Sequence, residues 1–218
     1  MNAHWPYDSV LVEGPDALTY LHSQLSQDLR NLAVDGSTWS FVLEPTGKVD
    51  ALVQVLRTGD ETFELRVDRG QGEALLARIN RFRIRVKAET SLGTGSVGDA
   101  SAYHAERVRA GWPAAGAEIT EGTIPAEMPN VVALAVSFSK GCYPGQELVE
   151  RMDSRASQAP RRLAVLRLPA GTSVGDAVEV AGEQVGTVTS IATDDSGVIA
   201  LALVRRGVEV PAELQPSS

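Results

Sequence analysis

The chain has 218 residues, of which 43% are hydrophobic and 22% charged, and its formal net charge is −8. This composition is typical of a globular protein with one large domain or two small ones, and the acidic balance argues against a protein whose main task is to neutralise nucleic-acid phosphates. The single cysteine, Cys142, excludes an internal disulfide framework and any metal site built from several cysteines.

The first ninety residues predict an α+β unit. Residues 10–13 read as a short strand, and leucines from position 18 to position 32 follow at near-helical spacing, which predicts an amphipathic helix of roughly four to five turns. The order strand–helix–strand–strand–helix–strand, with one extra strand, resembles a ferredoxin-like α+β unit. The further elements expected here are strands at 39–43, 49–56, 63–67 and 84–86 and a second helix from about residue 72 to residue 82.

The predicted structure changes at two places in the second half of the chain, at residues 91–100 and after Pro160. Three glycines mark residues 91–100 as a short flexible linker, a helix is expected at 101–110, and residues 131–138 read as extended and apolar. After Pro160 only short strands follow, which predicts a small antiparallel β-barrel or sandwich; these strands are expected at 163–168, 177–180, 184–191 and 198–204. We therefore divide the chain into an α+β domain (1–160), a C-terminal β-barrel (161–210) and a disordered tail (211–218).

The linker contains a literal G-x-G-x-x-G at residues 93–98, between a strand and a helix. A dinucleotide fingerprint also requires a complete βαβ unit, with an acidic residue at the end of the next strand. Here the helix leads into a turn-rich stretch rather than a hydrophobic strand, so a linker explains the glycines better.

The most distinctive segment is residues 140–147, Lys-Gly-Cys-Tyr-Pro-Gly-Gln-Glu, which we call the signature loop. Its glycines and proline force a turn, and Arg151 lies one helical turn beyond Glu147. In an extended segment Lys140 and Cys142 point the same way, and an ammonium that close would favour the thiolate. The alternative is a tight loop with a small buried cysteine and a surface salt bridge.

This loop resembles the signature of the YgfZ family, Lys-Gly-Cys-Tyr/Phe-x-Gly-Gln-Glu, at every fixed position. Residues 14–28, 45–48, 106–113, 135–138 and 186–190 resemble the family's other motifs, so the resemblance extends from about residue 8 to residue 206. YgfZ proteins bind folate and are tied to iron–sulfur cluster maintenance. Their relatives include a mitochondrial iron–sulfur assembly factor and the T-protein (aminomethyltransferase) of the glycine cleavage system.

The resemblance implies a T-protein-like fold with tetrahydrofolate in a central hole, and a functional thiol on Cys142 that Lys140 tunes. An aromatic ring can stack on a pterin, an amide and a carboxylate can read its donor–acceptor edge, and a cation suits the glutamate tail. For two further candidates, Gln24 and Lys48, an ordinary exposed residue is the alternative. The folate-binding candidates are Tyr143, Gln146, Glu147, Arg151, Gln24 and Lys48.

Two departures from the family pattern bear on this function. T-proteins carry an acidic residue in an Asn-Ala-x-Asn setting after the meander, whereas this chain has Arg-Val-Asp-Arg-Gly at 66–70, so we predict no aminomethyltransferase activity. Family members also carry a second α+β repeat where this chain has only the linker. One wall of the folate site is therefore expected to be absent or supplied by another subunit.

Three hypotheses follow. The first is a cytoplasmic YgfZ-like folate-binding protein that supports assembly or repair of iron–sulfur enzymes, with iron–sulfur proteins or assembly factors as partners. The second is a reduced, non-catalytic scaffold that has lost folate, and the third, disfavoured by the missing acidic motif, is a one-carbon transferase. We expect no bound metal, no nucleic acid and no membrane contact, because the chain shows no metal-site spacing, signal peptide or transmembrane stretch.

Overall fold

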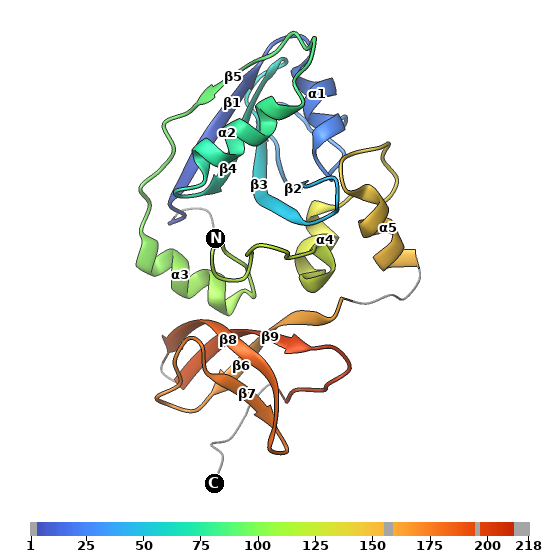
Figure 1. Ribbon diagram of the computed structural model, residues 1–218. Coiled ribbons are helices and arrows are strands. Elements are labelled where there is room, and N and C mark those ends of the chain that lie inside the picture. The colour runs from blue at the N-terminus through green and yellow to red at the C-terminus, as the bar shows by residue number, and fades with distance from the viewer. Residues whose placement is uncertain (1–3, 155–158, 195–196, 212–218) are drawn as a thin grey trace.

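The structure is a computed structural model, and it describes residues 4–154, 159–194 and 197–211. In this part of the chain two sheets lie one above the other, with helices between them and on the outer face of the first sheet (Figure 1). The prediction of an α+β protein with antiparallel sheets is confirmed. No helix of these residues is long and apolar enough to cross a membrane.

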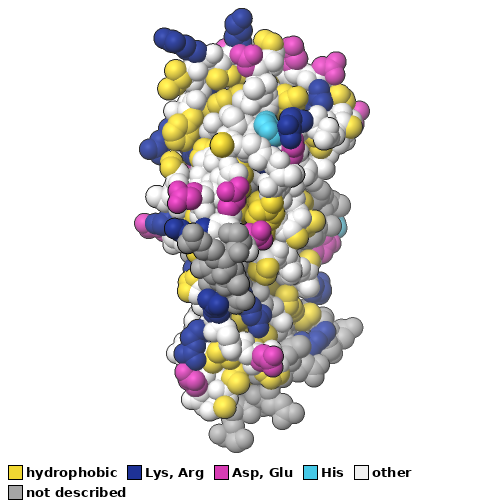
Figure 2. Space-filling view, turned by 90° about the vertical axis from the view of Figure 1, so that its right-hand side faces the viewer, with side chains coloured by type: hydrophobic (Ala, Val, Ile, Leu, Met, Phe, Trp, Pro, Cys, Tyr) yellow, Lys and Arg dark blue, Asp and Glu magenta, His cyan; other side chains and the backbone are white. Residues whose placement is uncertain are grey.

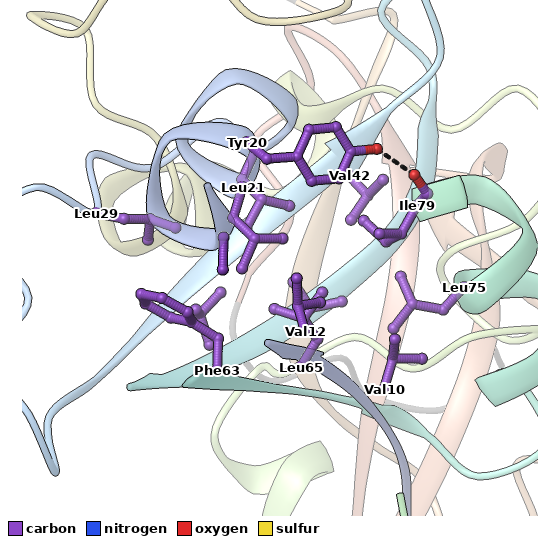
Figure 3. Close-up of a cluster of buried hydrophobic side chains, with 14 of the residues drawn as sticks. Val10, Val12, Tyr20, Leu21, Leu29, Val42, Phe63, Leu65, Leu75 and Ile79 are labelled. Carbon is purple, nitrogen blue, oxygen red and sulfur yellow. Dashed lines mark hydrogen bonds between the residues drawn. The ribbon is translucent and has the colours of Figure 1, made fainter. Parts of the chain in front are cut away.

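The first sheet has the strand order β2-β3-β4-β1-β5, and each neighbouring pair is antiparallel. Helices α1 (Ala17–Gln24) and α2 (Gly72–Arg81) cover one of its faces (Figure 3). Phe63 and Leu65, two positions apart on β4, are buried in this core, as are Leu75 and Ile79, one turn apart on α2. The strands are β1 (Tyr7–Glu13), β2 (Ser37–Leu43), β3 (Val49–Arg57), β4 (Thr62–Asp68) and β5 (Glu89–Leu92).

The first helix is shorter than predicted. It ends at Gln24, because Leu25 takes an extended backbone and forms an isolated β-bridge with Val42. Leu29 is still fully buried in the same core. The leucine spacing therefore indicated burial correctly but not the helix length, since an irregular segment can follow the same core surface.

The strand expected at 84–86 lies instead at β5, whose last two residues belong to the segment that we expected to be a flexible linker. The rest of that segment is held against β1, because Tyr7 and Ser96 exchange backbone hydrogen bonds of 3.0 and 2.7 Å. Gly98 has a φ of 50°, and a Cβ there would stand 2.3 Å from the carbonyl oxygen of His4. The glycines therefore permit close packing, and the segment is a fixed connection.

Residues 131–138, expected to be extended, contain a helix, α4 (Pro129–Ala135). Pro129 occupies its first turn, where a fixed φ and a missing N–H suit a helix start. The expected helix at 101–110 is confirmed as α3 (Ala100–Arg109). With the 3-10 turn η1 (Pro125–Glu127) and α5 (Gln146–Ser154), α4 closes a second core against β2 and β3, whose buried members include Phe41, Leu52, Trp112, Met128, Val131 and Tyr143.

The C-terminal strands are confirmed, but a closed barrel is not. The sheet runs β6-β9-β8-β7 and is open, because β6 pairs with β9 and β7 pairs with β8, without a β6–β7 ladder among the described residues. Four short strands suffice for an open sheet that buries one face, so alternation alone could not indicate closure. The strands are β6 (Arg161–Leu168), β7 (Ala177–Val180), β8 (Glu183–Asp194) and β9 (Gly197–Arg205). Of the tail that we expected to be disordered, residues 212–218 lie outside the described residues.

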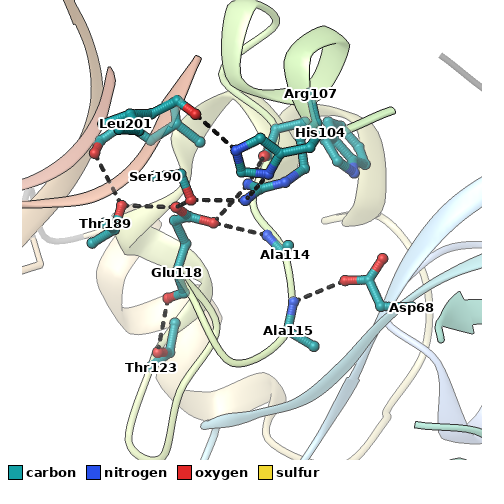
Figure 4. Close-up of polar contacts among 12 residues, drawn as sticks. Asp68, His104, Arg107, Ala114, Ala115, Glu118, Thr123, Thr189, Ser190 and Leu201 are labelled. Carbon is teal, nitrogen blue, oxygen red and sulfur yellow. Dashed lines mark hydrogen bonds and ion pairs between the residues drawn. The ribbon is translucent and has the colours of Figure 1, made fainter. Parts of the chain in front are cut away.

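A buried ion pair joins this sheet to the rest of the molecule (Figure 4). Arg107 of α3 donates to Glu118 at 3.0 Å, and their side chains are 5% and 0% exposed. Ser190 of β8 donates to Glu118 at 2.6 Å and accepts from Arg107 at 2.7 Å. Thr189 donates to the same carboxylate at 2.7 Å. The network ties α3, the following loop and β8 together.

Candidate functional site

The signature loop is anchored by a buried lysine. Lys140 is only 5% exposed, and its Nζ donates to the carbonyl oxygens of His22 and Leu25 at the end of α1. The same ammonium lies 4.9 Å from the centroid of the Tyr143 ring. A cation at a helix C-terminus satisfies carbonyls that lack helical partners and interacts favourably with the helix dipole. Lys140 thus fixes the loop to the first helix.

The rest of the loop is packed as tightly. Tyr143 is 7% exposed and belongs to the second core, and its backbone N–H donates to Oε1 of Gln146 at 3.3 Å. Gly145 has a φ of 81°, and a Cβ there would stand 2.6 Å from the carbonyl oxygen of Glu44. Only glycine combines that conformation with that approach, so the loop lies directly on the turn that contains Lys48.

In contrast, Cys142 is exposed to solvent. The alternative of a small buried cysteine is therefore wrong. Because Lys140 is engaged by the α1 carbonyls and by the Tyr143 ring, a direct effect of its ammonium on the Cys142 thiol remains a prediction. The arrangement is a loop held by the buried Lys140 and Tyr143 that presents the Cys142 thiol to solvent.

The predicted folate-binding residues separate into two groups. Tyr143 is buried beneath Lys140, and Gln24 is buried with its Oε1 3.5 Å from Nη1 of Arg78, so both have structural partners. Glu147 and Arg151 are exposed on α5, and Lys48 is half-buried. Gln146, also half-buried, holds the loop through Tyr143 and donates to Glu150. The structure therefore brings the loop residues together without directing them into one pocket.

Aromatic side chains pack between the first sheet and α3. Trp39 of β2 lies 4.6 Å from Trp112 and 5.4 Å from Trp5, measured between ring centroids, and Trp5 lies 6.1 Å from Tyr103 of α3. Trp5, Trp112 and Tyr103 are all buried. These rings pack against one another between the first sheet and α3.

An open groove lies beside the signature loop. It has a volume of about 400 Å³ and lies between η1, α4 and α5. Its walls include Phe138, which precedes the loop, and Leu148 and Met152, which follow it. Asp153 is the charged residue among the described residues that line it. Figure 2 views the molecule from the side of α5, where hydrophobic side chains reach the surface at mid-height with acidic side chains beside them.

Sequence reasoning missed this groove. Leu148, Val149, Met152 and Asp153 recur at helical spacing on α5 and share the groove side of that helix. That spacing was a readable signal. The opposite wall could not be foreseen, because it belongs to α4, which we expected to be an extended segment.

The burial of Lys140 makes the free energy of unfolding depend on pH. Burial lowers the pKa of Lys140 from its ordinary 10.5 to about 8; nearby Asp28 opposes this shift and Arg30 adds to it. The unfolded chain keeps the ordinary pKa and so binds more protons between pH 8 and 10.5, where the free energy of unfolding rises with pH. Below pH 8 Lys140 is protonated in both the folded and the unfolded chain, so burial of its charge lowers the free energy of unfolding by its full amount.

We expect the free energy of unfolding of the wild type to rise by about 1–3 kcal/mol relative to that of Lys140→Met when the pH is raised from about 7.5 to about 10. Urea unfolding of both proteins at the two pH values measures this difference, and other titrating groups cancel in it. The same change in both proteins would contradict a buried, destabilised ammonium.

The comparisons define a fold class. The chain matches the solved glycine cleavage system aminomethyltransferase T from Bartonella henselae with a TM-score of 0.70 and 17% identity, over 93% of this chain and 76% of that protein. The protein therefore has a T-protein-like fold. No family model matches the chain.

A curated relative is an uncharacterized protein of Haemophilus influenzae, which is 25% identical over 91% of this chain and 86% of its own length. That alignment spans 243 residues, more than this chain contains, so the relative has residues in the matched region that this chain lacks.

Proposed function

We propose that this protein is a YgfZ-like folate-binding protein that supports assembly or repair of iron–sulfur enzymes, with Cys142 as its functional thiol. The observation that carries the proposal is the signature loop. Lys140, Tyr143 and Gln146 are committed to holding the loop, while Cys142 alone of these four faces solvent. A rigid loop that presents a thiol is suited to contact with a second molecule.

The thiol must act together with another group. Iron–sulfur clusters are held by several thiolates, and this chain has a single cysteine. Among the described residues no group of histidine, cysteine and carboxylate side chains could hold a metal ion. Cys142 therefore acts transiently, or it shares a site with a partner such as an iron–sulfur protein or an assembly factor.

Tetrahydrofolate is the ligand that the resemblance to the T-protein implies, and the T-protein-like fold supports it. The exposed Glu147 and Arg151 and the half-buried Lys48 are open to such a ligand, whereas Tyr143 and Lys140 are not. Aminomethyl transfer is not part of the proposal. Asp68, which ends β4, accepts hydrogen bonds from Trp5 at 2.9 Å and from the backbone of Ala115 at 2.8 Å, a structural task.

The second candidate function is a scaffold without folate, favoured by the burial of Tyr143 and by the aromatic packing around Trp39. Calorimetric titration with tetrahydrofolate separates the two functions. A folate-binding protein gives a saturable heat with a micromolar dissociation constant. An absence of heat at high micromolar ligand would remove folate from the proposal and leave the scaffold.

A further inference from the structure

We propose that the inner face of the C-terminal sheet carries a second binding site, which takes the phosphate group of a small phosphate monoester. The site is an open pocket of about 570 Å³ between this sheet and the loop that follows α3. Its described lining includes no residue of the signature loop, and the proposal does not depend on the proposed function. The residues that carry the argument are Arg161, Arg205, Thr120, Thr187, Thr189 and Leu203.

The first argument is the position of two arginines. Arg161 of β6 and Arg205 of β9 are directly opposite each other in the antiparallel ladder, so their side chains leave the same face of the sheet. This face turns toward the rest of the molecule, because Leu163, two positions after Arg161, packs in a cluster with Val108 of α3. Like charges that are directly opposite destabilise a sheet. An anion between the two guanidinium groups would remove that repulsion.

The second argument is that both guanidinium groups are held at the pocket and keep donors for a ligand. Arg161 donates from Nε to Glu127 at 2.9 Å, and the Glu127 side chain is only 4% exposed. Arg205 donates from Nη2 to Glu183 at 2.8 Å. Each of these hydrogen bonds uses one donor of a group that has five. The pair of Arg205 with Glu183 is exposed, so solvent weakens it and an anion can compete for the same guanidinium.

The third argument is the number of donors, which favours a phosphate over a carboxylate. Thr120 and Thr187 are exposed at the pocket and can donate their hydroxyl protons, whereas the proton of Thr189 goes to Glu118 (Figure 4). Two bidentate arginine forks and two hydroxyls exceed the roughly four acceptor sites of one carboxylate. A phosphate monoester has three terminal oxygens and a charge of about −1.5 to −2 at pH 7. Leu203 adds an apolar wall for the carbon part of the ligand.

The test is a backbone-amide NMR titration of the full-length protein with inorganic phosphate and with glycerol 3-phosphate, at an ionic strength held constant with sodium chloride. Arg205→Gln removes one guanidinium from the pocket, and Thr187→Val removes a hydroxyl but leaves both ion pairs. Arg162→Gln is the matched control, because Arg162 is the next residue of β6, is exposed, points to the opposite face and is not part of the described lining. Thermal unfolding of each protein shows that the variants are folded.

We expect saturable shifts of the Thr120 and Thr187 amides, with glycerol 3-phosphate binding at least as tightly as inorganic phosphate. Arg205→Gln should weaken binding at least about tenfold and Thr187→Val about threefold, while Arg162→Gln binds like the wild type. Equal weakening by Arg205→Gln and Arg162→Gln would mean that the general field of the protein attracts the anion. Weaker binding of glycerol 3-phosphate than of inorganic phosphate would exclude a monoester. Either result, or no saturable shift in the wild type at about 10 mM ligand, would overturn the proposal.

Discussion

Replacing Glu118 by Gln is expected to lower the free energy of unfolding by about 3–5 kcal/mol, the largest stability effect that we predict. Glu118 is fully buried and accepts from Arg107 at 3.0 Å, from Thr189 at 2.7 Å, from Ser190 at 2.6 Å and from the Ala114 backbone at 3.0 Å. Without the carboxylate charge, the guanidinium of Arg107, whose side chain is 5% exposed, stays buried without a compensating charge.

The matched control is Glu183→Gln. Glu183 pairs with Arg205 at 2.8 Å, but the two side chains are 65% and 52% exposed, and exposed pairs contribute about 0–1 kcal/mol. Urea unfolding followed by tryptophan fluorescence measures both variants. A loss from Glu118→Gln no larger than that from Glu183→Gln would mean that the buried pair does not stabilise the fold.

The same variant should reveal what the network connects. Thr189 and Ser190 belong to β8, whereas Arg107 belongs to α3 and Glu118 to the loop after it. Weakening the network should therefore increase hydrogen exchange in β8 and β9 more than in β1 and β4, which share a separate core. Uniform exchange across both sheets would argue against a role in joining the two layers.

The sequence predicted the strands better than the helices. In β4 apolar and polar residues alternate with period two, and β4 and the C-terminal strands were located within a few residues. Leu25 and Leu29 are buried and Leu32 is partly buried, as a longer helix would predict, but all three lie beyond the end of α1. Helix α4 was missed because a short apolar run fits a strand and a helix equally well.

At the candidate site, the sequence predicted the position of the loop but not the direction in which its side chains point. The signature loop was located from its residue types, but the partners of Lys140 are carbonyl groups of α1, 115 and 118 positions earlier in the chain. Backbone carbonyls carry no sequence signal, so no spacing rule could reveal that Lys140 faces inward while Cys142 faces outward. The role that we expected Lys140 to play at the thiol depended on an extended backbone, and the loop instead turns between α4 and α5.

The second large effect concerns Cys142. In a strain that lacks this gene, Cys142→Ser is expected to restore iron–sulfur enzyme activities to less than about one tenth of the wild-type level, because a hydroxyl is a much weaker nucleophile and metal ligand than the thiol that the proposed function requires. The substitution should leave stability almost unchanged, since the side chain is exposed. Loss of function without loss of fold is what distinguishes a functional thiol from a structural one.

We propose that the signature loop serves to present this thiol, and complementation of the deletion strain is the decisive test. Ser139→Ala is the matched control, because Ser139 is exposed just before the loop, and immunoblots establish equal protein levels. We expect wild type and Ser139→Ala to restore the iron–sulfur enzyme activities and Cys142→Ser not to restore them. Full restoration by Cys142→Ser would contradict it.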